Sequence, residues 1–271
     1  MSSLPARALR LGPYRGGNDL SAQTKESPDD ESRRDWLKLA LAVGAGGAAG
    51  AVVAYLGVKD LEIGPLEFRD TIYYPPTPGE APSWWSSLVG QPMRVTDFGL
   101  WQGAPGLWRQ AFRAGRPVPD TGFPVLVIRI PRDDTVFSAP TDVSIPQGSR
   151  LFYDDPDREI RIVVLYNRCT HFCCQTGWHV FTIPDYLRQY SRPTPTYEVF
   201  GQDPIYCPCH DAQFDPMVLI KGSHPGAPLE YVGAAQVSGP ADRPLPVVPV
   251  RTVADTLEGV TASSSWYAYC R

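Results

Sequence analysis

Two short stretches of this 271-residue chain, Cys-Thr-His-Phe-Cys-Cys at 169–174 and Cys-Pro-Cys-His at 207–210, decide how its C-terminal part is built. Each box contains a histidine and at least two cysteines. Together the ten positions contain five of the six cysteines and two of the four histidines. Because thiolates and imidazoles at such close spacing are metal ligands, the boxes predict a metal centre formed where two loops face each other.

Two sulfur and two nitrogen ligands suit a tetrahedral zinc ion or an iron–sulfur cluster. In a Rieske-type [2Fe–2S] centre, two cysteines hold one iron and two histidines hold the other. One cysteine and one histidine from each box supply that set. A further cysteine then remains in each box, at Cys174 and Cys209, and the two can bridge the loops as a disulfide.

The boxes resemble those of the Rieske iron–sulfur subunit of cytochrome bc complexes, whose pattern is C-T-H-L-G-C followed by C-P-C-H-G-S. The resemblance implies an all-β fold, an antiparallel Rieske-type β sandwich over 91–271 with a small cluster-binding subdomain at about 168–232. It also implies a role for each residue: Cys169 and Cys207 on the inner iron, His171 and His210 on the outer iron, and a Cys174–Cys209 disulfide.

Several positions depart from the family pattern. Cys173 stands where the family has glycine, and it is either an idle thiol or the partner of Cys270. Ala212 and Phe214 replace a serine and a tyrosine whose hydroxyls bond cluster sulfurs in the family, and the carboxylate of Asp211, if ionised near the cluster, would lower the potential in the same way as the loss of these hydroxyls. Since such donors raise the reduction potential, we expect a low potential for this class and menaquinol as the favoured quinol.

Other segments near the boxes have an expected role. Phe172 replaces a leucine and is expected to act as an apolar lid over the cluster. The stretch 221–229, which includes Pro228, resembles the proline-rich loop that covers the cluster in the family. Residues 175–206 are longer than the family needs and are interpreted as an inserted loop, either covering the cluster, docking a partner or simply solvated.

The N-terminal part predicts a membrane anchor. Residues 1–35 are interpreted as a polar cytosolic tail. The stretch Ser-Arg-Arg-Asp-Trp-Leu-Lys at 32–38, which spans the end of this tail, resembles a twin-arginine export signal. An apolar, Gly- and Ala-rich stretch at 36–58 has the length of one transmembrane helix, and cleavage as a signal peptide is the alternative. The positive charge before it places the N-terminus in the cytoplasm of a prokaryote and the Rieske domain outside.

Residues 59–90 hold five prolines and are interpreted as an extended tether, with a strap packed on the domain as the alternative. Beyond them, short apolar runs predict the strands of an antiparallel β domain. The segment 99–121 is expected to be an inserted loop or short helix. The predicted strands are 125–130, 160–166, 218–220, 247–250 and 266–269.

The resemblance implies electron transfer in a respiratory membrane complex. The cluster would take an electron from a quinol, with the proton going to His171 or His210, and pass it to a cytochrome c or a copper protein. A cytochrome b-type subunit would hold the quinol. The Rieske subunit of another exported enzyme, such as an arsenite oxidase, and a non-redox zinc domain for assembly are the alternatives. With 25 basic and 29 acidic residues, the charge balance gives no indication of nucleic-acid binding.

Overall fold

The fold is taken from a computed structural model, which describes residues 64–76, 83–223, 230–261 and 270. The predicted anchor, the end of the proline-rich loop with Pro228, and the predicted strand 266–269 lie outside these residues. Within the described part of the chain, no helix is long and apolar enough to cross a membrane. The described residues all belong to one compact unit.

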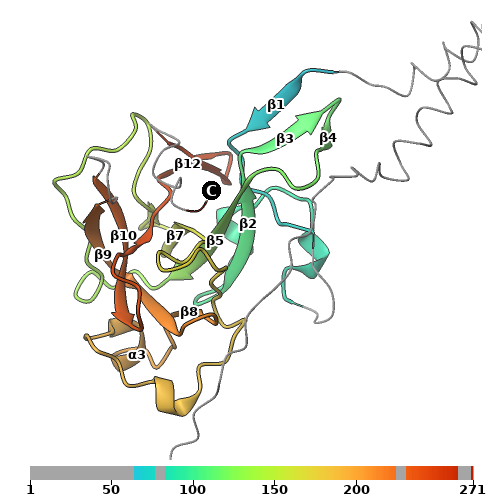
Figure 1. Cartoon of the computed structure of the whole chain (residues 1–271). Coiled ribbons are helices and arrows are strands. Elements are labelled where there is room, and N and C mark those ends of the chain that lie inside the picture. The colour runs from blue at the N-terminus through green and yellow to red at the C-terminus, as the bar shows by residue number, and fades with distance from the viewer. Residues whose placement is uncertain (1–63, 77–82, 224–229, 262–269, 271) are drawn as a thin grey trace, which may run out of the picture. The chain divides into compact units, whose positions relative to one another are not determined.

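The unit is mostly β, with several antiparallel sheets (Figure 1). The first four-stranded sheet has the order β2-β5-β7-β6 and the second β11-β10-β9-β8, while β1-β3-β4 and β12-β13 form smaller sheets. The bounds are β1 Leu66–Arg69, β2 Gly103–Trp108, β3 Gln110–Arg113, β4 Arg116–Pro117, β5 Phe123–Ile130, β6 Tyr153–Asp155, β7 Ile160–Tyr166, β8 Ile205–Cys207, β9 Ala212–Ser223, β10 Glu230–Ser238, β11 Leu245–Pro246, β12 Val250–Val253 and β13 Thr256–Gly259.

Helical structure is confined to short turns in the described residues. Three 3-10 turns span Ser86–Leu88, Val95–Asp97 and Asp185–Leu187, and the α-helix α3 spans Pro195–Glu198. The prolines and glycines that separate the apolar runs explain why longer helices do not form there.

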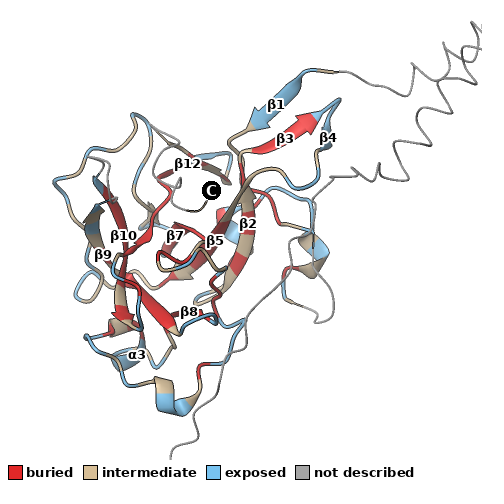
Figure 2. Ribbon diagram, viewed as in Figure 1, coloured by how far each residue is buried: buried red, intermediate tan, exposed pale blue. Residues whose placement is uncertain are grey.

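The first sheet is buried on both of its faces. Every residue of β7 is buried, and β5 is buried at five of its eight positions. Alternate residues face opposite cores, because Val125 and Val127 belong to one apolar cluster while Leu126 and Ile128 belong to the other. Figure 2 shows the buried residues gathered on the central strands. Burial on both faces explains why Ile160–Tyr166 is apolar at every position except Arg161.

The second sheet carries the two ends of the second box. Strand β8 ends at Cys207 and β9 begins at Ala212, so the box is the turn that joins two paired strands. The first box follows β7 of the other sheet. The two sheets share one apolar cluster, which includes Leu165, Cys169 and Cys207, and this cluster brings the boxes together.

Two sequence predictions in this domain are wrong. Residues 99–121 contain strands β2, β3 and β4 rather than a loop or helix. The sequence gives only a weak strand signal here, because β2 reads Gly-Ala-Pro-Gly-Leu-Trp. A Cβ at Gly106 would lie 2.8 Å from a side-chain carbon of Ile72, so close packing requires glycine at this position. The predicted strand 247–250 is divided: β11 ends at Pro246 and β12 begins at Val250.

The described parts of the predicted tether pack on the domain. Ile72, Tyr74 and Trp85 are buried in the first apolar cluster, and β1 pairs with β3. Tyr73 exchanges two backbone hydrogen bonds with Leu107 of β2, at 2.9 and 2.8 Å. These contacts have the character of a strap on the domain rather than of a free spacer.

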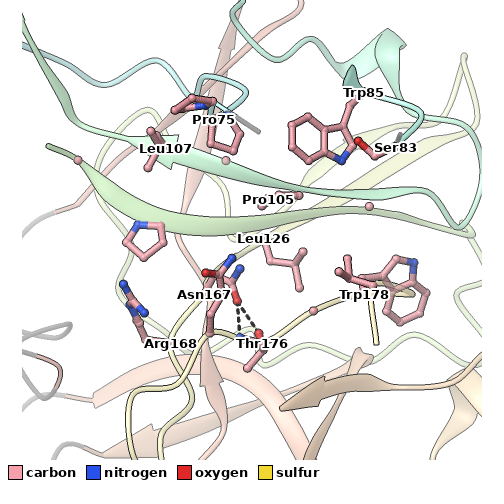
Figure 3. Close-up of a pocket in the computed structure, with 18 of the residues that line it drawn as sticks. Pro75, Ser83, Trp85, Pro105, Leu107, Leu126, Asn167, Arg168, Thr176 and Trp178 are labelled. Atoms are coloured by element: carbon pink, nitrogen blue, oxygen red, sulfur yellow. Dashed lines mark hydrogen bonds between the residues drawn. The ribbon is translucent and has the colours of Figure 1, made fainter. Parts of the chain in front are cut away.

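A cavity of about 1130 Å³ lies over β2 and β5, beside the residues that flank the first box (Figure 3). Its floor includes Pro105 and Leu126, which are paired across the two strands and therefore lie on the same face of the sheet.

Candidate metal centre

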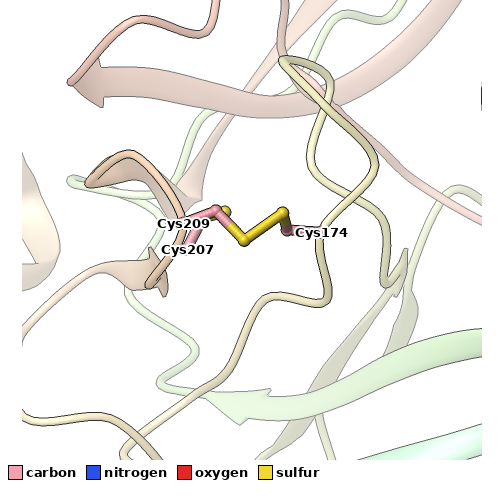
Figure 4. Close-up of side chains that lie close together, drawn as sticks. All are labelled: Cys174, Cys207 and Cys209. Atoms are coloured by element: carbon pink, nitrogen blue, oxygen red, sulfur yellow. A yellow bond between two sulfur atoms is a disulfide. The ribbon is translucent and has the colours of Figure 1, made fainter.

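The two boxes lie against each other and are held by a disulfide. Cys174 and Cys209 are bonded, with their Cα atoms 6.4 Å apart, as Figure 4 shows. The two cysteines are 35 positions apart in the sequence, and the bond joins two loops that come from different sheets. The predicted pairing is confirmed in the structure.

The third cysteine of the first box is also bonded. Cys173 pairs with Cys270 across 97 residues, which resolves the choice between an idle thiol and a bridge. Cys173 has a φ of 60°, in the left-handed region that glycine favours, and the related pattern has glycine at this position. The cysteine therefore keeps the glycine conformation and adds a covalent link to the C-terminal end.

The two remaining cysteines, Cys169 and Cys207, are free, buried and paired. Each is only 1 % exposed, and their side chains are hydrogen-bonded to each other. That hydrogen bond lowers the pKa of Cys207 to about 6 and, together with burial, raises the pKa of Cys169. Thiolates are the form in which cysteines bind metals, so two adjacent buried cysteines, one with a lowered pKa, fit the role of two ligands of one metal.

Backbone N–H groups from both boxes are directed at these sulfurs. Those of His171 and Phe172 donate to the Cys169 sulfur, and those of Cys209 and His210 donate to the Cys207 sulfur. Such donors favour the thiolate over the thiol and orient it. The turns that present them are closed by a 2.8 Å bond from the Cys173 N–H to the Cys169 carbonyl and a 3.0 Å bond from the Asp211 N–H to the Cys207 carbonyl.

The two histidines form a second pair, separate from the cysteines. The ring centroids of His171 and His210 lie 4.9 Å apart. His210 is exposed and His171 is half-buried, and the Nδ1 atom of His171 is buried with no hydrogen-bond partner. A buried imidazole nitrogen that has no partner in the protein fits the role of a metal ligand, because a metal would satisfy its lone pair.

The four predicted ligand atoms do not form one compact group in the described residues. Around a single tetrahedral zinc ion, ligand atoms at about 2.0 to 2.3 Å from the metal lie within about 4 Å of one another. In the described residues, the group of three metal-ligating side chains whose atoms all lie within 4.8 Å is Cys174, Cys207 and Cys209, not the four predicted ligands (Figure 4). Two of its sulfurs are already in the disulfide, so this group offers a metal only the Cys207 thiolate.

The residues predicted to surround the cluster lie close to the boxes where the structure describes them. Phe172 is 66 % exposed, and its ring centroid is 4.3 Å from that of His171 and 5.4 Å from that of His210. It therefore covers the imidazole pair from outside. Ala212 and Phe214 are fully buried on β9, and neither carries a hydroxyl that could reach a sulfur.

Sequence reasoning missed three groups that hold the loops. The Tyr206 hydroxyl donates to Asp211, and both burial and this bond raise the pKa of Tyr206. Thr170 exchanges two hydrogen bonds with Arg243, of 2.8 and 2.9 Å. Gly239, at φ 84°, lies so close to the second box that a Cβ there would be 2.5 Å from the Asp211 carbonyl oxygen. Only the glycine had a signal in the sequence, since a Ser-Gly-Pro run marks a turn.

The insertion between the boxes is anchored to the domain. The carboxylate of Asp215, fully buried on β9, accepts hydrogen bonds from the Thr194 hydroxyl, from the hydroxyl and N–H of Thr196, and from the N–H of Met217. At the other end of the insertion, the ring of Trp178 lies 5.8 Å from that of Trp101, and its indole N–H donates to the Trp101 carbonyl oxygen. The insertion is thus part of the scaffold that positions both boxes.

Comparison with protein-family models and with curated proteins gives no match to this chain.

Proposed function

We propose that the chain is the electron-transfer subunit of a membrane quinol oxidoreductase and that a Rieske-type [2Fe–2S] cluster binds to Cys169, His171, Cys207 and His210. The observation that carries the proposal is the sorting of the ligands into a buried cysteine pair and a more exposed histidine pair. A Rieske centre needs this asymmetry, with sulfur on one iron and imidazole on the other. The fold class then extends to the finer prediction of a Rieske-type β sandwich with a cluster-binding subdomain.

When bound, the cluster would take up and release one electron. The chain's own residues would do the rest. The buried Nδ1 of His171 would face the metal, which leaves Nε2 as the nitrogen that can accept a proton from a quinol. His210 is exposed, so a quinol hydroxyl could approach its imidazole, with the ring of Phe172 beside both histidines. The cysteine pair would stay out of water, because Cys169 and Cys207 are each 1 % exposed.

The low reduction potential remains part of the proposal. Ala212 and Phe214 present no hydroxyl to the sulfurs, and the hydroxyl of Tyr206 is already used by Asp211. Among the described residues, the sulfurs receive hydrogen bonds from backbone N–H groups, and no side-chain hydroxyl that would stabilise the extra electron is recorded on them. A potential in the lower part of the range of about −150 to +300 mV favours menaquinol as donor.

The proposed partners follow from the resemblance: a cytochrome b-type subunit, and a cytochrome c or copper protein as acceptor. The two disulfides favour an oxidising compartment, so the domain is proposed to lie outside the cytoplasm of a prokaryote. The single-pass anchor and the twin-arginine signal belong to residues outside those described.

Analysis of the purified full-length chain tests the proposal. We expect iron and acid-labile sulfide in equal amounts, near two of each per chain, and an electron paramagnetic resonance signal that appears only after reduction. Redox titration of that signal should give a midpoint in the lower part of the class range. A colourless protein with one zinc ion per chain refutes the proposal and supports the zinc alternative. Co-purification with a b-type haem separates the quinol complex from an arsenite oxidase-type enzyme.

A further inference from the structure

The small sheet β1-β3-β4 exposes apolar side chains on one of its faces. Leu66 and Phe68 of β1 are 46 % and 62 % exposed, and because they are two positions apart on one strand, they point to the same side. β1 is also an edge strand, since it pairs with β3 alone. Proteins normally protect an edge strand that carries exposed apolar residues, so this face is expected to meet something beyond the described residues.

Two arginines lie on the same face of this sheet. Arg113 is paired with Leu66 across β3 and β1, and Arg116 is paired with Arg113 across β4 and β3, so the three side chains point to one side. Both arginines are exposed, and within the described ranges neither forms an ion pair. The acidic residue of the sheet, Glu67, points to the opposite face, where its carboxylate lies 3.6 Å from Arg69. The apolar face is therefore positively charged, in a chain whose net charge is -4.

This face lies where the chain enters the domain. Gly64 precedes β1 and lies beside the turn between β3 and β4, since a Cβ on it would be 3.7 Å from the backbone nitrogen of Ala114 and 3.9 Å from the Cγ of Arg113. Only residues 59–63 separate Gly64 from the predicted anchor at 36–58, and an extended chain of that length spans about 20 Å at most. The headgroup layer of a bilayer is itself about 5 to 8 Å deep. With the anchor in a membrane, the face must therefore lie near lipid headgroups.

We propose that the face of β1-β3-β4 that carries Leu66, Phe68, Arg113 and Arg116 binds the surface of a membrane that contains anionic lipids. The two guanidinium groups would bind lipid phosphates, to which arginine donates pairs of hydrogen bonds, and the anionic headgroups would attract their charge. Leu66 and Phe68 would enter the boundary between headgroups and acyl chains. The inference rests on the membrane anchor of the proposed function but not on the identity of the metal.

Quenching of tryptophan fluorescence by brominated lipids tests the inference in the full-length chain. Phe68→Trp places a reporter on the face, and Val199→Trp is its matched control, because Val199 is 56 % exposed beside α3, at the opposite end of the domain from β1 in Figure 1. Each variant is reconstituted into vesicles of phosphatidylcholine, or of equal parts phosphatidylcholine and phosphatidylglycerol, brominated in the acyl chains next to the headgroup. Relative to the native chain, Phe68→Trp should gain at least threefold more quenching in the anionic vesicles than in the neutral ones, and Val199→Trp should gain none.

The role of the arginines is tested in the Phe68→Trp background. Replacing both, by Arg113→Gln and Arg116→Gln, should remove most of the gain in quenching, and high salt should do the same when both arginines are present. Arg192→Gln is the control, since Arg192 is an exposed arginine of the insertion and its replacement should leave the gain unchanged. An unchanged gain in the double variant overturns the inference.

Alkaline extraction of the same vesicles reports on the anchor separately. A chain that is extracted refutes the anchor of the proposed function, and this inference with it. If the chain is retained, the inference alone is overturned when Phe68→Trp gains no quenching, when Val199→Trp gains as much, or when the gain does not depend on lipid charge. Protection of the Phe68→Trp reporter from acrylamide without quenching by lipid would mean that a protein covers the face, and it would likewise overturn the inference.

Discussion

The buried carboxylate of Asp215 is predicted to hold the insertion in place, and its replacement by alanine should be strongly destabilising. The side chain is fully buried and accepts four hydrogen bonds, two from threonine hydroxyls and two from the backbone N–H groups of Thr196 and Met217. After Asp215→Ala, the hydroxyls can rotate to new partners but the two N–H groups cannot. A stranded buried donor costs about 1 to 3 kcal/mol, so the loss for two should be about 2 to 6 kcal/mol.

Urea unfolding of the purified protein, followed by tryptophan fluorescence, measures this loss. Asp142→Ala is the matched control, since its carboxylate is 77 % exposed and pairs only with Lys221; it should cost less than about 1 kcal/mol. Limited proteolysis should cut the Asp215→Ala variant first within residues 185–203, because α3 loses its attachment to β9. A loss below about 1 kcal/mol together with wild-type resistance to protease would refute the assigned role.

Three further predictions concern the salt bridges, the second disulfide and the environment of the metal. Arg158 lowers the pKa of Asp155 to about 2. The stabilisation from this pair is therefore present above about pH 4 and is lost as the pH falls towards 2. The melting temperature of Arg158→Gln should fall less over this interval than that of the wild type. Removing the Cys173–Cys270 disulfide by Cys270→Ser should lower the free energy of unfolding in urea by about 4 to 5 kcal/mol. In that background, Cys173→Gly should be more stable than Cys173→Ser by about 1 kcal/mol, because φ at this position is 60°. If the proposed cluster is bound, Phe214→Tyr should raise its midpoint potential by about 45 to 65 mV, the equivalent of one hydrogen bond of about 1 to 1.5 kcal/mol for one electron; an unchanged or lower potential in redox titration would contradict it.

The sequence predicts those strands whose own residues are mostly apolar, because such strands can be recognised without knowing their neighbours. β5 and β7 are each apolar except for one arginine, and their predicted bounds agree with the structure to within two residues. β2 gives no such signal, because its two glycines are required by close packing against Trp178 and Ile72, which are distant in the sequence. The same limit applies to Val247 and Val248, which are apolar but lie between two prolines that cannot donate to a sheet.

The candidate site also has parts that the sequence predicts and parts that it does not. The ligands in each box lie two or three residues apart, so they can be recognised in the sequence, and the resemblance to the Rieske pattern supplied the Cys174–Cys209 pair. The choice between an idle Cys173 and a bridge to Cys270 could not be made, because it depends on the path of the 96 residues between them. Asp215 was missed because aspartate is an ordinary loop residue, and only its burial shows that it organises the structure.

The geometry of the boxes depends on cross-links that bypass the long insertion between them. Loops joined only by the 32 residues of 175–206 would sample many relative positions, and closing them around a metal would cost conformational entropy. Here the Cys174–Cys209 bond fixes one loop to the other, Cys173–Cys270 fixes the first loop to the C-terminal end, and Asp215 fixes the insertion to β9. These links hold both loops in place however the chain between them runs. The long segment 175–206 therefore need not loosen the boxes that it connects.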